Sequence, residues 1–180
     1  MPLVNHLMTA VLALEYLDER TVITMSQEAV QLADDLSTFS AGGRYPVSYL
    51  LYALLLDDSN AAAYALAEEI SGSHINFVTT MNNRASAIGM QNSLFTNATG
   101  EYDPGQYTNT NDLMILLRYA LRNDDFLDYF SQRDNMYTLP DGSRHYFSND
   151  FSSAWSFSDN TVEGAILSSY DNRYTAALLL

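Results

Sequence analysis

The sequence feature that most constrains the fold of this chain is an apolar helical pattern near its N-terminus. Its hydrophobic residues cover most of a helical surface: Leu3, Val4, Leu7, Met8, Val11, Leu12, Leu14 and Leu17. A helix that is apolar on nearly every side is stable only where other parts of the protein surround it. No apolar run reaches the roughly 18 to 20 residues that span a bilayer. The pattern therefore predicts the buried central helix of a globular domain.

The middle of the chain predicts a series of shorter helices. Gly72 and Gly89 are expected to end two of them, and Ser73 is expected to cap the start of the second. A long polar loop covers residues 92–106, and Thr110 or Asn111 is expected to cap the helix that follows it. The predicted helical ranges are 46–55, 61–70, 74–88, 111–120 and 126–130.

Strand patterns are concentrated after Arg133. A hairpin is expected from residues 136–139 and 144–147, which flank Pro140-Asp141-Gly142, and two further strands are expected over residues 162–167 and 174–180. An additional short extended piece is expected within residues 21–26. Helices first and strands last predict an α+β domain, a helical cluster packed on a small antiparallel sheet.

The predicted sheet is incomplete, because two strands bury little apolar surface and leave their edges exposed. Residues 1–180 are expected to form a single domain that is truncated at both ends. A missing segment or another chain should then cover the sheet, and a homo-oligomer formed through the sheet edge is one such arrangement.

The composition excludes several classes of function. The chain has 22 acidic and eight basic residues, a formal charge of -14, which would repel the phosphates of a nucleic acid. All eight basic residues are arginine, and cysteine is absent, so lysine-dependent and thiol chemistry are unavailable. His6, His74 and His145 show no ligand spacing, so neither a metal nor an organic cofactor is predicted.

Several segments resemble the D-alanyl-D-alanine carboxypeptidases, the low-molecular-weight penicillin-binding proteins that trim peptidoglycan stems. The matching sequence segments include residues 46–51, 59–63, 65–68, 88–90, 95–97 and 107–113, with weaker matches at 144–149 and 162–164. The resemblance implies a β-lactamase-like, penicillin-binding-protein-like fold. It also implies a serine acyl-transfer site built from the motifs Ser-x-x-Lys, Ser-x-Asn and Lys-Thr-Gly.

All three motifs are degenerate in this chain. The resemblance sets the nucleophile position at Leu3 and the lysine position at His6. In the second motif Asn60 is retained, but Asp58 stands in place of the serine. The third motif falls on Ile166, Leu167 and Ser168. No catalytic residue is therefore predicted, and His6 and Asp58 are expected to lie close together on one wall of the former cleft.

The resemblance and the lost motifs together favour a catalytically silent relative, which binds a peptidoglycan peptide or a protein partner weakly. One alternative is an active carboxypeptidase that is completed by residues outside this chain. Another is an assembly or binding module that acts through an exposed sheet edge. The resemblance implies an extracytoplasmic or cell-wall location, although no signal peptide or transmembrane segment is recognisable in the sequence.

Overall fold

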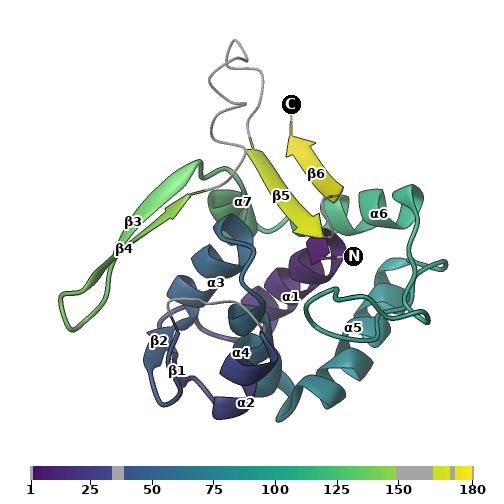
Figure 1. Cartoon of the computed structure of the whole chain (residues 1–180). Helices are drawn as coiled ribbons and strands as arrows, with labels where there is room; N and C mark the ends of the chain where they lie inside the picture. The colour runs from purple at the N-terminus through teal and green to yellow at the C-terminus, as the bar shows by residue number, and fades with distance from the viewer. Residues whose placement is uncertain (1, 34–38, 149–163, 171–172, 180) are drawn as a thin grey trace.

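The computed structural model describes residues 2–33, 39–148, 164–170 and 173–179, with the backbone alone described in the last two ranges (Figure 1). Helix α1 (Pro2–Tyr16) lies at the centre of the helical cluster, and every residue from Leu3 to Ala13 is buried. It contacts α3 (Val47–Leu56), α4 (Asn60–Ser71), α5 (His74–Ile88), α6 (Thr110–Ala120) and α7 (Asp124–Phe130). The prediction of a buried central helix is confirmed.

The local signals that start and end the helices act largely as expected. Gly72 and Gly89 end α4 and α5 with φ of 75° and 95°, a left-handed conformation in which only glycine avoids strain. The Ser73 side chain caps α5 by accepting a hydrogen bond from the amide of Asn76. The cap of α6 is Asn109, so the predicted cap at Thr110 or Asn111 was wrong by one or two residues.

The described strands form three separate antiparallel pairs. Strand β1 (Val22–Thr24) pairs with β2 (Arg44–Pro46), β3 (Asp134–Thr138) pairs with β4 (Arg144–Ser148), and β5 (Gly164–Tyr170) pairs with β6 (Arg173–Leu179). Strand β2 and the short helix α2 (Gln27–Leu32) were not predicted, because pieces of three to six residues carry too little periodicity. Coverage of the β5–β6 edges by another chain stays a prediction.

An aromatic cluster attaches the β3–β4 hairpin to the helices. The ring of Tyr49 on α3 contacts Tyr137 and Phe147 edge-on, with centroids 5.3 and 4.9 Å away, and it stacks on Tyr45 at 5.3 Å. Ser48 and Tyr137 add a 2.7 Å hydrogen bond between their hydroxyl groups. These contacts fix the base of the hairpin, which extends away from the helices in Figure 1.

The long polar loop is held by the amide side chains of two helices. Asn82 on α5 exchanges two hydrogen bonds with the backbone of Phe95, and Asn5 on α1 donates to the Asn97 carbonyl at 2.7 Å and to the Gln106 side chain at 2.9 Å. The loop is thus anchored to the central helix. Within the described residues, the helices are all too short or too polar to cross a membrane.

The burial of Tyr49 predicts a loss of stability in alkali. Burial raises the pKa of its hydroxyl to about 12, above the ordinary tyrosine value of 10.0. The unfolded chain therefore releases this proton first, and stability that is complete below about pH 10 should fall as the pH rises towards 12. In urea denaturation, Tyr49→Phe should show a smaller fall than the parent between pH 9 and about pH 11. Tyr102→Phe, at a ring that is 74% exposed, is the control. Equal slopes for the Tyr49→Phe variant and the parent would contradict this assignment.

Candidate functional site

Three elements bring the positions of the degenerate motifs together. They are the N-terminal end of α1, the corner between α3 and α4, and strand β5, which contacts both α1 and α3. Figure 1 shows the end of α1 close to the β5–β6 pair. The chain order of these elements is that expected from the resemblance, so their arrangement can be followed position by position.

At the end of α1, the positions that the resemblance assigns to the nucleophile and the base are both buried. Leu3 is 1% exposed and belongs to the hydrophobic core. His6 follows one helical turn later, on the same side of the helix, and is completely buried. A leucine side chain has no atom that could attack a carbonyl group.

The predicted proximity of His6 and Asp58 is confirmed. Nδ1 of His6 lies 2.7 Å from Oδ1 of Asp58, whose side chain is 26% exposed. The pair is not aligned as a hydrogen bond, and His6 Nε2 has no hydrogen-bond partner among the described residues. The contact is therefore best described as a close electrostatic pair that is open to solvent on the aspartate side.

Asp58 adopts a backbone conformation that few residues tolerate. Its φ is 54°, and it is the one non-glycine residue with a positive φ in the described part of the chain. Aspartate and asparagine enter this left-handed region more readily than most other residues. The turn between α3 and α4 thus directs the carboxylate towards α1.

Ser59 and Asn60 start helix α4. The Ser59 hydroxyl accepts a hydrogen bond from the Ala62 amide at 3.3 Å and caps the helix. Asn60 is the first residue of α4 and is partly buried. Asn60 therefore lies at the N-terminus of α4, two residues after Asp58 of the His6–Asp58 pair.

The third motif position lies in the backbone of β5. In the register with β6, Ile166 is opposite Ala177, Leu167 is opposite Ala176 and Ser168 is opposite Thr175. The side chains of these residues lie outside the described part of the structure. Their predicted role as replacements for the Lys-Thr-Gly motif stays a prediction.

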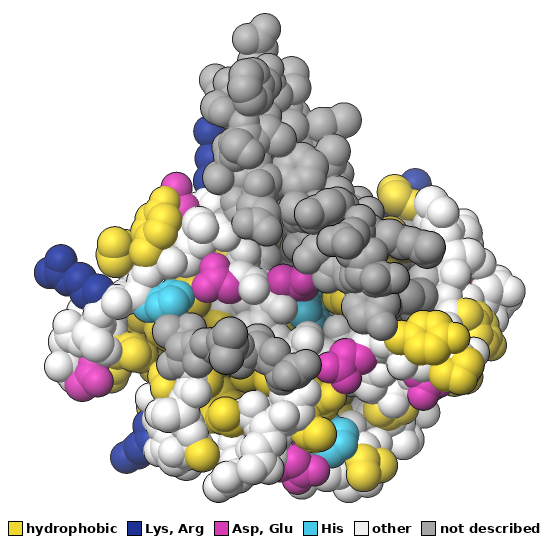
Figure 2. All heavy atoms as spheres, viewed as in Figure 1, with side chains coloured by type: hydrophobic (Ala, Val, Ile, Leu, Met, Phe, Trp, Pro, Cys, Tyr) yellow, Lys and Arg dark blue, Asp and Glu magenta, His cyan; other side chains and the backbone are white. Residues whose placement is uncertain are grey.

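A second histidine–aspartate pair, which the sequence did not indicate, adjoins the first. His145 Nε2 on β4 lies 3.2 Å from Oδ2 of Asp57, and the amide of Ser148 donates to Oδ1 of the same carboxylate. Asp57 and Asp58 thus contact histidines from two different elements. On the face shown in Figure 2, histidine side chains (cyan) lie beside acidic ones (magenta).

A cavity of about 710 Å³ opens beside this second pair, between the β1–β2 pair and the tip of the β3–β4 hairpin. Its wall combines aromatic rings with two arginines and one carboxylate: it includes Arg44, Tyr45, Tyr49, Asp141, Arg144 and His145. Neither arginine has an ion-pair partner among the described residues. The cavity is therefore suited to a small ligand that carries a negative charge.

The described residues of the site hold two close histidine–aspartate pairs. No described hydroxyl group is hydrogen-bonded to His6, and the sequence contains no lysine. The described residues that could ligate a metal through histidine and carboxylates lie elsewhere, on α2, α4 and the start of α5. This arrangement of charged and aromatic side chains can bind a small charged ligand.

Comparison with known proteins points to one family. The family model described as D-alanyl-D-alanine carboxypeptidase matches residues 4–157. The carboxypeptidase DacF of Bacillus subtilis is 28% identical over 130 residues, which cover 69% of this chain and 33% of that protein. The chain spans about a third or less of the length of the curated relatives that it matches.

Two solved structures from Mycobacterium tuberculosis share the fold. A penicillin-binding protein homologue is similar with a TM-score of 0.84 and 24% identity, and a D-alanyl-D-alanine carboxypeptidase with a TM-score of 0.83 and 22% identity. In both cases 96% of this chain and 65% of the other chain are covered. The predicted penicillin-binding-protein-like α+β fold is confirmed.

The His6–Asp58 contact should stabilise the fold, because the buried imidazole has no hydrogen-bond partner among the described residues. Asp58→Asn keeps the side-chain size and the tolerance for positive φ but removes the charge. We expect it to lower the free energy of unfolding by about 1 to 3 kcal/mol, as measured by urea denaturation at pH 6. Asp128→Asn, at an exposed position on α7, is the control. In a double-mutant cycle with His6→Leu, strictly additive effects would show that the two side chains do not interact.

Proposed function

Since the chain belongs to the D-alanyl-D-alanine carboxypeptidase family, whose members act on peptidoglycan peptides, we propose that it is a catalytically silent member. It retains a cleft that binds a cell-wall peptide weakly. The observation that carries the proposal is Leu3, a buried core residue at the nucleophile position. The enzymatic activity of the longer relatives is not part of the function proposed for this chain.

Loss of the nucleophile acts on the chemical step of the reaction. In a serine acyl-transfer enzyme, loss of the nucleophile alone lowers kcat by about six orders of magnitude. Here the lysine position holds His6, which approaches Asp58 but no hydroxyl group among the described residues. A histidine oriented by a carboxylate resembles a general base, but a base without a nucleophile cannot form an acyl-enzyme. The pair is accordingly assigned a structural role.

The 710 Å³ cavity has side chains that can bind the end of a cell-wall peptide. Peptidoglycan stem peptides end in a carboxylate, and arginine binds carboxylates through paired hydrogen bonds. Arg44 and Arg144 both line the cavity, next to the tyrosine rings on which an extended peptide can pack. Asp57, through His145, connects this cavity to the position of the second family motif. An extracytoplasmic location, where such peptides occur, is part of the same proposal.

Catalytic silence predicts that the protein neither forms an acyl-enzyme nor releases D-alanine. Incubation with a fluorescent penicillin should give no covalent label in denaturing gels, because no described nucleophile occupies the site. A peptide ending in D-Ala-D-Ala should remain intact by mass spectrometry. An active carboxypeptidase of the same family is the positive control. Labelling or alanine release would contradict the proposal and favour an active enzyme.

The arginine-lined cavity predicts weak, saturable binding of the same peptide. In NMR titrations, the chemical shifts of the peptide should change as it binds. Arg144→Gln should weaken the affinity for the peptide several-fold, about 1 kcal/mol, through loss of a charge-assisted contact. Arg118→Gln, an exposed arginine on α6, is the matched control and should bind as the parent does. Equal affinity of the parent and the Arg144→Gln variant would exclude this cavity as the peptide site.

A further inference from the structure

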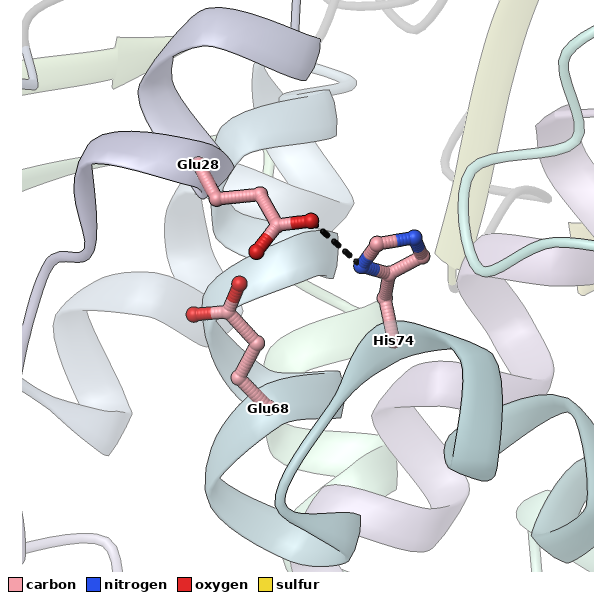
Figure 3. Close-up of side chains that lie close together, drawn as sticks. All are labelled: Glu28, Glu68 and His74. Atoms are coloured by element: carbon pink, nitrogen blue, oxygen red, sulfur yellow. Dashed lines mark ion pairs between the residues drawn. The ribbon is translucent and has the colours of Figure 1, made fainter.

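A cluster of three potential metal ligands lies outside the family site. Glu28 on α2, Glu68 on α4 and His74 on α5 each present one ligand atom, and these atoms all lie within 4.8 Å of one another (Figure 3). The cluster combines an imidazole nitrogen with two carboxylate oxygens. It is therefore a mixed donor set and not a patch of acidic residues alone.

The local structure explains how three helices deliver these side chains to one point. The left-handed Gly72 ends α4 and the Ser73 cap starts α5 directly afterwards, so that His74, the first residue of α5, turns back beside Glu68. Glu28 lies in the first turn of α2, which is capped by Ser26 and contacts α4. In Figure 3 the Nδ1 edge of the His74 ring faces the two carboxylates.

The His74 ring is held in place more firmly than its partners. It packs edge-on against Tyr64, with ring centroids 5.3 Å apart, and its side chain is 20% exposed. The Glu28 side chain is 63% exposed and can change its rotamer freely. One preorganised nitrogen and an adjustable carboxylate allow the cluster to close around an ion at small conformational cost.

The charges in the cluster are incompletely balanced. His74 Nδ1 and Glu28 Oε1 are 3.7 Å apart, which is an ion pair only when the histidine is protonated. Among the described residues the Glu68 carboxylate has neither a hydrogen-bond donor nor an ion-pair partner, and the arginine ion pair that is described, Arg84 with Glu15, lies elsewhere. Two neighbouring carboxylates in a chain of formal charge -14 favour a bound cation.

We propose that Glu28, Glu68 and His74 bind one divalent transition-metal ion, of which Zn²⁺ best fits the donor set. Zinc accepts both imidazole nitrogen and carboxylate oxygen, whereas Mg²⁺ and Ca²⁺ prefer oxygen ligands alone. Tetrahedral zinc with bonds of about 2.0 to 2.2 Å places its ligand atoms roughly 3.3 Å apart. The cluster therefore needs to contract by about 1.5 Å at most, and water completes the coordination.

Such an ion joins α2 to the α4–α5 junction. It binds the folded chain, where three helices converge, and not the unfolded chain, in which the ligands are separated by up to 46 residues of sequence (28 to 74). Binding should therefore stabilise the fold by mass action. The role is structural, and it is independent of whether the family site binds peptide.

The test is calorimetric titration of the tag-free chain with zinc chloride, in buffer that contains millimolar Mg²⁺. We expect one equivalent of Zn²⁺ to bind saturably and to raise Tm. Glu68→Gln and His74→Gln should each weaken binding at least about tenfold and remove most of the rise in Tm. Glu69→Gln changes the neighbouring, exposed carboxylate on α4 and should leave zinc binding unchanged. Circular dichroism and Tm in EDTA establish that each variant is folded.

Two results would overturn the proposal. One is weak, non-saturating uptake of zinc by the parent, which would identify the cluster as a simple ion pair on the surface. The other is unchanged affinity and an unchanged rise in Tm in both Glu68→Gln and His74→Gln, which would place the zinc at other residues. Because no readout uses peptide or penicillin, neither result bears on the function proposed for the family site.

Discussion

The burial of α1 on all sides is the constraint on which the rest of the structure depends. Five helices and strand β5 contact it, and each residue from Leu3 to Ala13 is removed from solvent. A helix in this position offers a large apolar surface for packing, but every polar side chain on it needs a partner. The polar residues of α1 therefore determine where several distant segments lie.

Three of these polar residues organise two sides of the molecule. Asn5 and Thr9 hold the loop of residues 92–106 through hydrogen bonds to the Asn97 and Ala98 carbonyls. His6 is directed to the α3–α4 corner, where Asp58 approaches it at 2.7 Å. In this way the central helix joins the polar loop to the corner between α3 and α4.

The α3–α4 corner holds two neighbouring histidine–aspartate contacts. Asp57 contacts His145 of the β3–β4 hairpin while Asp58 contacts His6 of the central helix. The corner therefore connects the helical cluster with the hairpin and with the arginine-lined cavity beside it. Charge pairing and packing maintain the arrangement of these elements. This is the physical basis for proposing binding without catalysis.

Part of the structure was determined by the sequence alone. The apolar pattern of α1, the glycines that end α4 and α5, and the hairpin around Pro140-Asp141-Gly142 are local features, because periodicity and turn chemistry act over a few residues. The resemblance to the carboxypeptidases likewise depended on the sequence alone, and it correctly predicted that His6 lies close to Asp58. It also located Leu3, whose burial follows from its place on the apolar helix.

Only the tertiary structure decided the contacts between elements distant in sequence. Strand β2 and helix α2 are too short to show a pattern, and they form because β1 and α4 provide partners. The Asp57–His145 contact joins residues 88 positions apart, and the ligand cluster of Glu28, Glu68 and His74 assembles from three helices. The distances within the ligand cluster are set by a helix cap, a left-handed glycine and the packing of α2 on α4. Because the packing brings together residues that are far apart in the sequence, no rule based on sequence spacing detects such a group.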